Sequence, residues 1–297
     1  MRHPYFDVAT PTVIGHRGSA GDAPENTLPS FALGLASGAA ILESDVHLTR
    51  DGVPVLLHDD AVDRTTDGSG RVAALSLAQL QTLDAGHRFS ADGGRTHPFR
   101  GRGLRVPTLE EALAAFPDAR FNLELKEGLP GLVEGCLERI RNAGGERRTL
   151  LTAGDDALMQ ELRAGVAQSG LPVALGASAR EVGDFLRCAI EKRGPAPGPM
   201  ALQVPPDFGG RPLVTREFVE HAHAHHLVVH VWTIDEPDQM RALLALGVDG
   251  IVTDYPTRLA EVIARQTAEG GAQRAEGERS SLKPERSSSN PASGVRC

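Results

Sequence analysis

Short apolar runs alternate with longer amphipathic stretches along most of the chain. The runs are rich in β-branched and aliphatic residues and are bounded by polar or glycine-containing turns, a pattern typical of strands buried on both faces. We expect strands at Thr12 to His16, Ala40 to His47, Arg120 to Lys126, Thr149 to Ala153, Val173 to Ala177, Ala201 to Val204, Val228 to Thr233 and Gly250 to Thr253. Strands that alternate with helices in this way predict βα units and a parallel sheet.

The stretches between these runs have helical period. They include Ser30 to Ser37, Gly131 to Asn142, Asp155 to Ala167, Ala179 to Lys192, Thr215 to His226 and Pro237 to Leu246. Eight βα units favour an α/β fold of the closed (β/α)8 TIM-barrel type over an open doubly wound sheet.

One stretch does not fit a plain barrel. Val53 to His58 reads as an extra strand, which the turn Asp51-Gly52 joins to the second barrel strand as a hairpin. The following residues, 59–106, are rich in glycine, aspartate and arginine, with one amphipathic piece near Leu75 to Leu83. We interpret them as a small insertion between the second and third barrel strands, on the face where loops build the site.

The end of the chain changes in character. From residue 266 onward the sequence is polar, built of small residues and without apolar period. Such a segment cannot bury enough apolar surface to offset the entropy of ordering. We therefore expect one domain over residues 1–265 and a disordered tail over residues 266–297.

Composition supports a globular, soluble protein of 297 residues, because 40% of them are hydrophobic and 24% are charged. The formal net charge of -8 gives no attraction to nucleic acid, so we expect a small-molecule substrate and no nucleic-acid partner. The three cysteines are too sparse for a disulfide framework and indicate a reducing compartment. The oligomeric state stays open.

No targeting segment is visible in the sequence. The first residues lack the apolar stretch of a signal peptide, and no run approaches the ~18 apolar residues of a membrane span. We expect a cytoplasmic protein without a stable membrane anchor, although a mature form that has lost its leader would look the same.

Ionisable residues gather where a barrel builds its mouth. The first strand ends in His16 and Arg17, and the extra strand ends in His58. Glu43 and Asp45 on the second strand are two positions apart and share one face, and the same holds for the pair at positions 124 and 126. In a βα barrel the carboxyl ends of the strands and the following loops carry catalytic residues.

Carboxylates that point into one barrel need compensation, because unpaired buried charges cost several kcal/mol each. Glu43, Asp45 and Glu124 are oxygen donors, which suit one hard divalent cation, Mg²⁺ or Ca²⁺. The alternative is a salt-bridged interior, in which Lys126 pairs with Glu124 or Arg17 pairs with Glu43.

Several motifs together resemble the glycerophosphodiester phosphodiesterase family of the bacterial cytoplasmic type. They are HRG with PENT, E-x-D, DG-x-P-V-x-x-HD, R-T-T-x-G-x-G, PTLEE, E-x-K, V-x-x-W-T and GVDGI-x-TD-x-P. They stand here as His16 to Gly18 with Pro24 to Thr27, Glu43 and Asp45, Asp51 to Asp59, Arg64 to Gly70, Pro107 to Glu111, Glu124 and Lys126, Val229 to Thr233, and Gly247 to Pro256. The resemblance spans roughly residues 12 to 260, in order.

The resemblance implies a (β/α)8 barrel with an insertion after the second strand, and metal-dependent hydrolysis of glycerophosphodiesters to an alcohol and sn-glycerol 3-phosphate. It makes Glu43, Asp45 and Glu124 the metal ligands, His16 and His58 the acid/base pair, and Arg17 and Lys126 the phosphate-binding residues. Imidazoles titrate near pH 6.5 and can exchange protons at working pH. We favour His16 as base and His58 as acid, with the reverse open, and with water or the neighbouring glycerol hydroxyl as nucleophile.

Three further positions are ambiguous. The resemblance places Glu25 near the metal or the substrate glycerol, but Glu25 could instead cap the next helix. The resemblance implies that Trp232 packs against the substrate, and the alternative is that it belongs to the core. Asp235 stands where the family usually has asparagine, and a carboxylate cannot donate the hydrogen bond that an amide can.

Two other functions compete with the leading one. A lysophospholipase D-type hydrolase would need an apolar route for an acyl chain, and the insertion is mostly polar. A non-catalytic phosphoester-binding barrel predicts the loss of a histidine or a carboxylate, and all of them are present.

Overall fold

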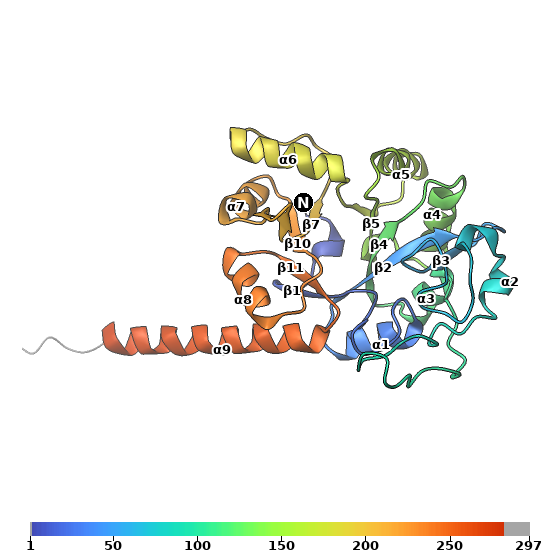
Figure 1. The fold of residues 1–297 in the computed structure, drawn as a ribbon. Helices are drawn as coiled ribbons and strands as arrows, with labels where there is room; N and C mark the ends of the chain where they lie inside the picture. Colours follow the sequence, from blue (N-terminus) through green and yellow to red (C-terminus); the bar gives the residue numbers. More distant parts are fainter. Residues whose placement is uncertain (1, 282–297) are drawn as a thin grey trace, which may run out of the picture.

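Eight parallel strands form the centre of the structure, a computed structural model that describes residues 2–281 (Figure 1). They are β1 (Thr12–Gly15), β2 (Ile41–Leu48), β4 (Arg120–Leu125), β5 (Thr149–Thr152), β6 (Ala174–Leu175), β7 (Ala201–Val204), β10 (Val228–Val231) and β11 (Gly250–Thr253). Their order in the sheet is β6-β5-β4-β2-β1-β11-β10-β7. Each predicted barrel strand is therefore confirmed.

The barrel is nearly closed, with one seam. No strand pairing joins β6 to β7 within the described residues. Only the backbone N–H of Met200 bridges these strands there, donating to the Leu175 carbonyl at 2.8 Å. Since β6 is only two residues long, it offers little backbone for a regular ladder. The predicted (β/α)8 fold is confirmed.

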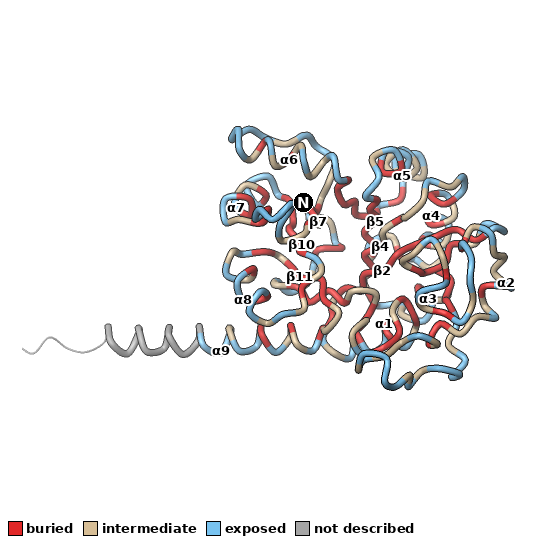
Figure 2. Tube along the Cα trace, viewed as in Figure 1, coloured by how far each residue is buried: buried red, intermediate tan, exposed pale blue. Residues whose placement is uncertain are grey.

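Helices surround the barrel and turn their buried sides toward it (Figure 2). They are α1 (Leu28–Ala36), α3 (Leu109–Ala115), α4 (Leu132–Asn142), α5 (Asp156–Ser169), α6 (Ala179–Glu191), α7 (Arg216–Ala224), α8 (Pro237–Leu246) and α9 (Pro256–Ser281). The six predicted helices are confirmed. Sequence reasoning missed α3 and a short hairpin of β8 (Asp207–Phe208) and β9 (Arg211–Pro212).

Strand period decides which side chains enter the barrel. On β2, Leu42 and Val46 pack in the cluster between sheet and helices, so Glu43 and Asp45 face inward. The register pairs Asp45 with Glu124 on the neighbouring β4. Two carboxylates from different strands therefore lie side by side inside the barrel, as the strand period predicts.

The amino-terminal end of the barrel is plugged by the chain's own first turn. Tyr5 and Phe6, in a 3-10 turn over Pro4–Phe6, are buried with inward apolar residues of the strands. Ile14, Ile41, Leu150, Ala174, Ala201, Val228 and Val252 complete this cluster. With this end filled, the opposite end, where the strands' carboxyl ends lie, is left for the site.

The insertion has a small core of its own. β3 (Pro54–Leu56) pairs antiparallel with β2, as the Asp-Gly turn predicts. The amphipathic piece forms α2 (Leu77–Leu80), which the 3-10 turn Val72–Ala74 precedes. The apolar cluster of the insertion consists of the buried residues Val55, Leu57, Val62, Val72, Leu80, Ala85 and Val106. The insertion is thus fastened to the barrel through the hairpin.

The expected disordered tail differs in part. The last helix, α9, continues to Ser281, so residues 266–281 are helical where sequence reasoning expects disorder. Residues 282–297 lie outside the described residues. A helix that begins in packed contact with β1 and β11 can extend past its last apolar contact, because propagation costs less than nucleation. The division into one domain over residues 1–265 stays a prediction.

Candidate active site at the barrel mouth

The first strand ends in a loop that orients His16. Its Nδ1 lies 2.6 Å from the Asp254 carboxylate, and its Nε2 lies 4.0 Å from that of Glu43. Asp254 is itself held by Asp235, whose Oδ1 accepts the backbone N–H of Asp254 at 2.8 Å and the Thr253 hydroxyl at 3.0 Å. A carboxylate partner on Nδ1 leaves Nε2 as the nitrogen that faces the site.

Opposing influences act on the imidazole of His16. Burial favours the neutral form and would lower its pKa, but the hydrogen bond to Asp254 and the charge of Glu43 outweigh this and raise the pKa above its usual value. This His16 environment therefore favours proton uptake.

His58, at the end of the extra strand, is arranged in a similar way. Its Nδ1 lies 2.7 Å from Oδ1 of Asp59, the next residue. Arg64 donates a hydrogen bond to each oxygen of Asp59. The hydrogen bonding to Arg64, and to a smaller extent that to His58, lowers the pKa of Asp59 to about 2. Asp59 therefore stays ionised at neutral pH, and Nε2 of His58 is left for a substrate.

The three inward carboxylates meet cationic side chains. Lys126 Nζ lies 2.8 Å from Asp45 Oδ1 and 2.7 Å from Glu124 Oε2, so it bridges the two strands. Glu43 accepts the backbone N–H of Arg17 at 3.0 Å. Within the described residues, no three His, Cys, Asp or Glu side chains stand as a metal-binding group. Of the two salt bridges expected as the alternative to a metal, the Lys126–Glu124 pair is present. The Arg17 guanidinium instead pairs with Glu25 at 2.7 Å and Asp45 at 3.4 Å, and not with Glu43.

The donor set nevertheless fits a hard cation. Burial and the neighbouring charge of Asp45 raise the pKa of Glu43, because nothing nearby fully compensates its carboxylate. Lys126 and Arg17 lower the pKa of Asp45 against its own burial. Three oxygen-bearing side chains, one of them poorly compensated, are the chemistry that Mg²⁺ or Ca²⁺ takes.

Arg17 has a buried donor without an acceptor. Its Nε has no hydrogen-bond partner among the described residues and lies 3.4 Å from Asp45 Oδ2. Buried N–H groups are rarely left unpaired, so an acceptor such as a phosphate oxygen fits this position.

A continuous chain of ion pairs joins the two histidine loops. Arg17 Nη1 donates to Glu25 at 2.7 Å, and Glu25 accepts from Arg64 at 2.6 and 2.8 Å. Arg64 then reaches Asp59, the partner of His58. The chain fixes the insertion against the first loop.

The structure excludes the alternative that Glu25 caps the next helix, α1. Thr27, not Glu25, caps α1, accepting the N–H of Ser30. Asn26 donates to Asp45 at 3.1 Å instead of capping. Glu25 is 17% exposed and is engaged by two arginines, so it does not act as a helix cap.

Trp232 directly follows β10 at the carboxyl end of the strand and is 44% exposed. The alternative that Trp232 is a core residue is therefore wrong.

Sequence reasoning missed the partners of both histidines, Asp254 and Asp59. Each follows its strand in a motif quoted for the family resemblance, TD and HD, but neither was assigned to the site. For Asp254 the signal was its position directly after a barrel strand, and for Asp59 it was its position next to His58.

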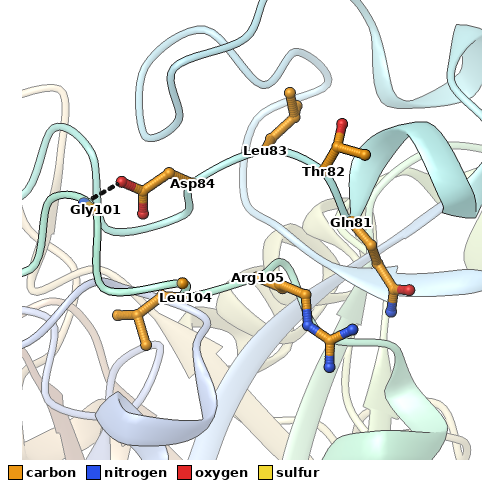
Figure 3. A pocket seen from close by; sticks show the side chains of 8 residues that line it. Gln81, Thr82, Leu83, Asp84, Gly101, Leu104 and Arg105 are labelled. Carbon is orange, nitrogen blue, oxygen red and sulfur yellow. Dashed lines mark hydrogen bonds between the residues drawn. The ribbon is translucent and has the colours of Figure 1, made fainter.

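Two cavities lie along the insertion. One of about 340 Å³ lies between Gln81–Asp84 and Gly101–Arg105, where Asp84 accepts the N–H of Gly101 at 2.7 Å (Figure 3). None of the proposed site residues lines it. The other, of about 350 Å³, is lined by Glu25 and Asp254 and therefore adjoins the site.

Known proteins are similar to this chain in sequence and in fold. A glycerophosphodiester phosphodiesterase from Caldanaerobacter subterraneus is 30% identical over 261 residues, which cover 85% of this chain and 98% of that protein. Two solved structures share the fold. One, a glycerophosphodiester phosphodiesterase from Agrobacterium tumefaciens, has a TM-score of 0.67 at 26% identity and covers 84% of this chain and 99% of its own. The other is an Oleispira antarctica phosphodiesterase in complex with the product sn-glycerol-3-phosphate. It has a TM-score of 0.66 at 28% identity, and the match covers 86% of this chain and 97% of that chain.

Among the helices of residues 2–281, none has the length and apolar character needed to cross a membrane. Residues 16–160 and 195–258 match the family described as "Glycerophosphoryl diester phosphodiesterase family". The matched ranges include His16, Glu43, Asp45, His58 and Glu124. The chain therefore belongs to the glycerophosphoryl diester phosphodiesterase family of enzymes.

Proposed function

We propose that the protein hydrolyses glycerophosphodiesters to an alcohol and sn-glycerol 3-phosphate by general acid–base catalysis, with His16 as base and His58 as acid. One observation carries the proposal. Both imidazoles are held through Nδ1 by a carboxylate, Asp254 at 2.6 Å and Asp59 at 2.7 Å, so both present Nε2. Paired, oriented imidazoles can take a proton from a nucleophile and give one to a leaving alkoxide.

His16 is suited to accept a proton because two carboxylates, Asp254 and Glu43, lie near its ring. Its Nε2 would take the proton of the nucleophile, either water or the adjacent glycerol hydroxyl. His58, which is 36% exposed at the insertion, would give its proton to the departing alcohol.

Glu43, Asp45 and Glu124 would hold one divalent cation, Mg²⁺ or Ca²⁺. When bound, the cation would neutralise negative charge on the phosphate oxygens. Lys126, which contacts Asp45 and Glu124, would then be free to bind a phosphate oxygen, and the unpartnered Nε–H of Arg17 would donate to another.

Glu25 and Trp232 would act around this centre. Glu25 would hold Arg17 and Arg64 in place through the hydrogen bonds described above. Trp232, exposed at the mouth of the barrel, would pack against the substrate.

Activity on a substrate panel tests the proposal. Protein stripped of metal with a chelator would be assayed on glycerophosphoglycerol, glycerophosphocholine and lysophosphatidylcholine, with and without added Mg²⁺ or Ca²⁺. We expect sn-glycerol 3-phosphate from the water-soluble diesters only when the cation is present. Preference for the acylated lipid would instead identify a lysophospholipase D. Cation-independent turnover would reject the metal role, and absence of product from every substrate would reject the activity.

A further inference from the structure

A cavity of about 350 Å³ adjoins the proposed reaction centre and has no role in the proposed chemistry. The loop after β1, the insertion and the residues after β11 line it together. Asp254 is part of its wall and also binds His16, so the cavity begins beside the imidazole proposed to react. One arm of a phosphodiester centred at His16 can therefore extend into it.

The carboxylates in the wall are already engaged. Glu25 accepts from Arg17 and Arg64, and Asp254 pairs with His16. Both carboxylates are thus held by protein side chains, and neither is free to turn toward a cationic ligand. Desolvating such a ligand without an opposing charge is unfavourable.

Arg88 supplies positive charge that these carboxylates do not compensate. It is exposed on the insertion and lines the cavity. Its Nε donates to the Thr66 carbonyl at 2.9 Å, which fixes the guanidinium. Within the described residues, no carboxylate lies within ion-pair distance of it. The remaining N–H groups can bind an anion or several hydroxyl groups.

The aromatic residues in the wall do not form a cage for a quaternary ammonium. The guanidinium of Arg258 lies 4.0 Å from the centre of the Tyr255 ring, so it already takes the cation–π position. Gly21 is so close to this ring that a Cβ at residue 21 would lie 2.2 Å from Cε1. Phe89 packs edge-on against Phe99, with ring centres 5.3 Å apart.

We propose that this cavity receives the alcohol arm of the diester and that Arg88 makes it selective for anionic or polyhydroxylated alcohols over quaternary ammonium alcohols. This inference rests on the proposed function and names the substrate class within it. The selectivity comes from Arg88 repelling a cation while donating hydrogen bonds to carboxylate, phosphate or hydroxyl oxygens.

A charge reversal tests the inference. The ratio of kcat/KM for glycerophosphoinositol to that for glycerophosphocholine would be measured for the wild type, Arg88→Glu and Arg100→Glu. Arg100 is a matched control, because it is exposed on the insertion, donates Nε to the His87 carbonyl at 2.9 Å and does not line the cavity. We expect a wild-type ratio well above one, a fall of about tenfold or more in Arg88→Glu, and no change in Arg100→Glu.

The other possible results distinguish failure of the proposed function from failure of the proposed selectivity. If the wild type cleaves neither diester, the proposed function itself fails. If it cleaves both without preferring the inositol diester, the inference about the alcohol class is wrong. Equal losses on both substrates in Arg88→Glu would also overturn it, since the cavity would then hold the glycerol arm common to both. If Arg100→Glu changed the ratio of kcat/KM as much as Arg88→Glu does, the effect would come from the general surface charge and the inference would be wrong.

Discussion

Each proposed catalytic imidazole depends on a carboxylate that lies just beyond the carboxyl end of a strand. Asp254 binds His16 across 238 positions of sequence, whereas Asp59 is the neighbour of His58. Asp235 fixes Asp254 by accepting its backbone N–H. A carboxylate oxygen accepts this hydrogen bond as well as an amide oxygen would. Aspartate at position 235 can therefore hold Asp254 as the asparagine expected from the family resemblance would.

The carboxylate of Asp254 is expected to act through His16 and not on the substrate directly. We predict that Asp254→Asn lowers kcat by about 10²-fold with little change in KM, because the imidazole loses its orientation and its charge partner. In a His16→Ala background the same change should cost almost nothing, since groups that act as a unit are not additive. Steady-state kinetics of the four proteins would measure this.

Asp22→Asn is the control, because this carboxylate lies in the loop after β1 that also carries His16, and it accepts a hydrogen bond from the Ser19 hydroxyl at 3.1 Å. It should leave kcat unchanged. Equal, additive losses from Asp254→Asn and His16→Ala would contradict the positioning role.

The sequence predicted part of the site well and another part poorly, for a physical reason. Strand period places Glu43 and Asp45 on one face, and the structure confirms that they point inward. The same rule cannot find the His16–Asp254 pair, because that contact depends on β1 and β11 being neighbours in the closed barrel. It also cannot show that Lys126 bridges Asp45 and Glu124, which depends on the register of β2 and β4.

At the scale of elements, the insertion is held to the first loop mainly by one side chain. Arg64 bridges Glu25 and Asp59, and so ties the loop after β1 to the residue that orients His58. The insertion's apolar cluster lies apart from the two clusters between sheet and helices. Loss of the Arg64 bridge should therefore loosen the insertion without unfolding the barrel.

We predict that Arg64→Ala speeds amide hydrogen exchange in residues 59–93, because the insertion loses its bridge to the first loop. We also predict that kcat/KM falls by about tenfold to a hundredfold, because Asp59 no longer holds the His58 imidazole in position. Exchange in β4 and β5 should not change. Arg105→Ala is the control, since Arg105 is an exposed insertion residue whose carboxylate partner, Glu111, lies 3.9 Å away. Uniform exchange in both variants and unchanged kcat/KM would refute this role.

Elements with strong period were predictable, and those that depend on local capping were not. The barrel strands carry long apolar or alternating runs and were found from the sequence. The helix α3 is short and is set by a capping box, in which Thr108 and Glu111 exchange side-chain to backbone bonds. The PTLEE segment could have indicated it. The hairpin of β8 and β9 consists of exposed residues, so no burial pattern marks it.

In the whole molecule, apolar side chains fill the amino-terminal end of the barrel, and the candidate active site lies at the opposite end. The apolar plug of Tyr5 and Phe6 closes the amino-terminal end. His230 on β10 lies beside this plug, with its ring centre 6.5 Å from that of Phe6. It is fully buried, and its Nδ1 has no hydrogen-bond partner in the described part of the chain.

This histidine links folding stability to pH. Burial lowers the pKa of His230 to about 4, from an ordinary value near 6.5. Between those values the unfolded chain takes up a proton that the folded protein does not, so stability falls as the pH decreases from about 6.5 to about 4. The full loss is about 3 kcal/mol.

We predict that His230→Leu removes this part of the acid destabilisation, because leucine does not titrate and has a similar volume. Urea unfolding of both proteins at several pH values between about 4 and 7.5 would measure the difference in their pH slopes. Because the other titrating groups are shared, that difference isolates His230. Parallel slopes would show that His230 does not titrate in this range.

The proposed mechanism requires that His16 and His58 divide proton transfer between them at one phosphodiester. Its most direct test is the turnover of His16→Ala and His58→Ala on two diesters, glycerophosphoglycerol and a glycerophosphoryl nitrophenyl ester whose leaving group needs no protonation. We predict that both variants lose about 10²-fold or more on the first diester and that only His58→Ala recovers on the second. Recovery of only His16→Ala would reverse the two roles. Near wild-type turnover of the first diester by both variants, or equal recovery of both on the second, would contradict the division of proton transfer.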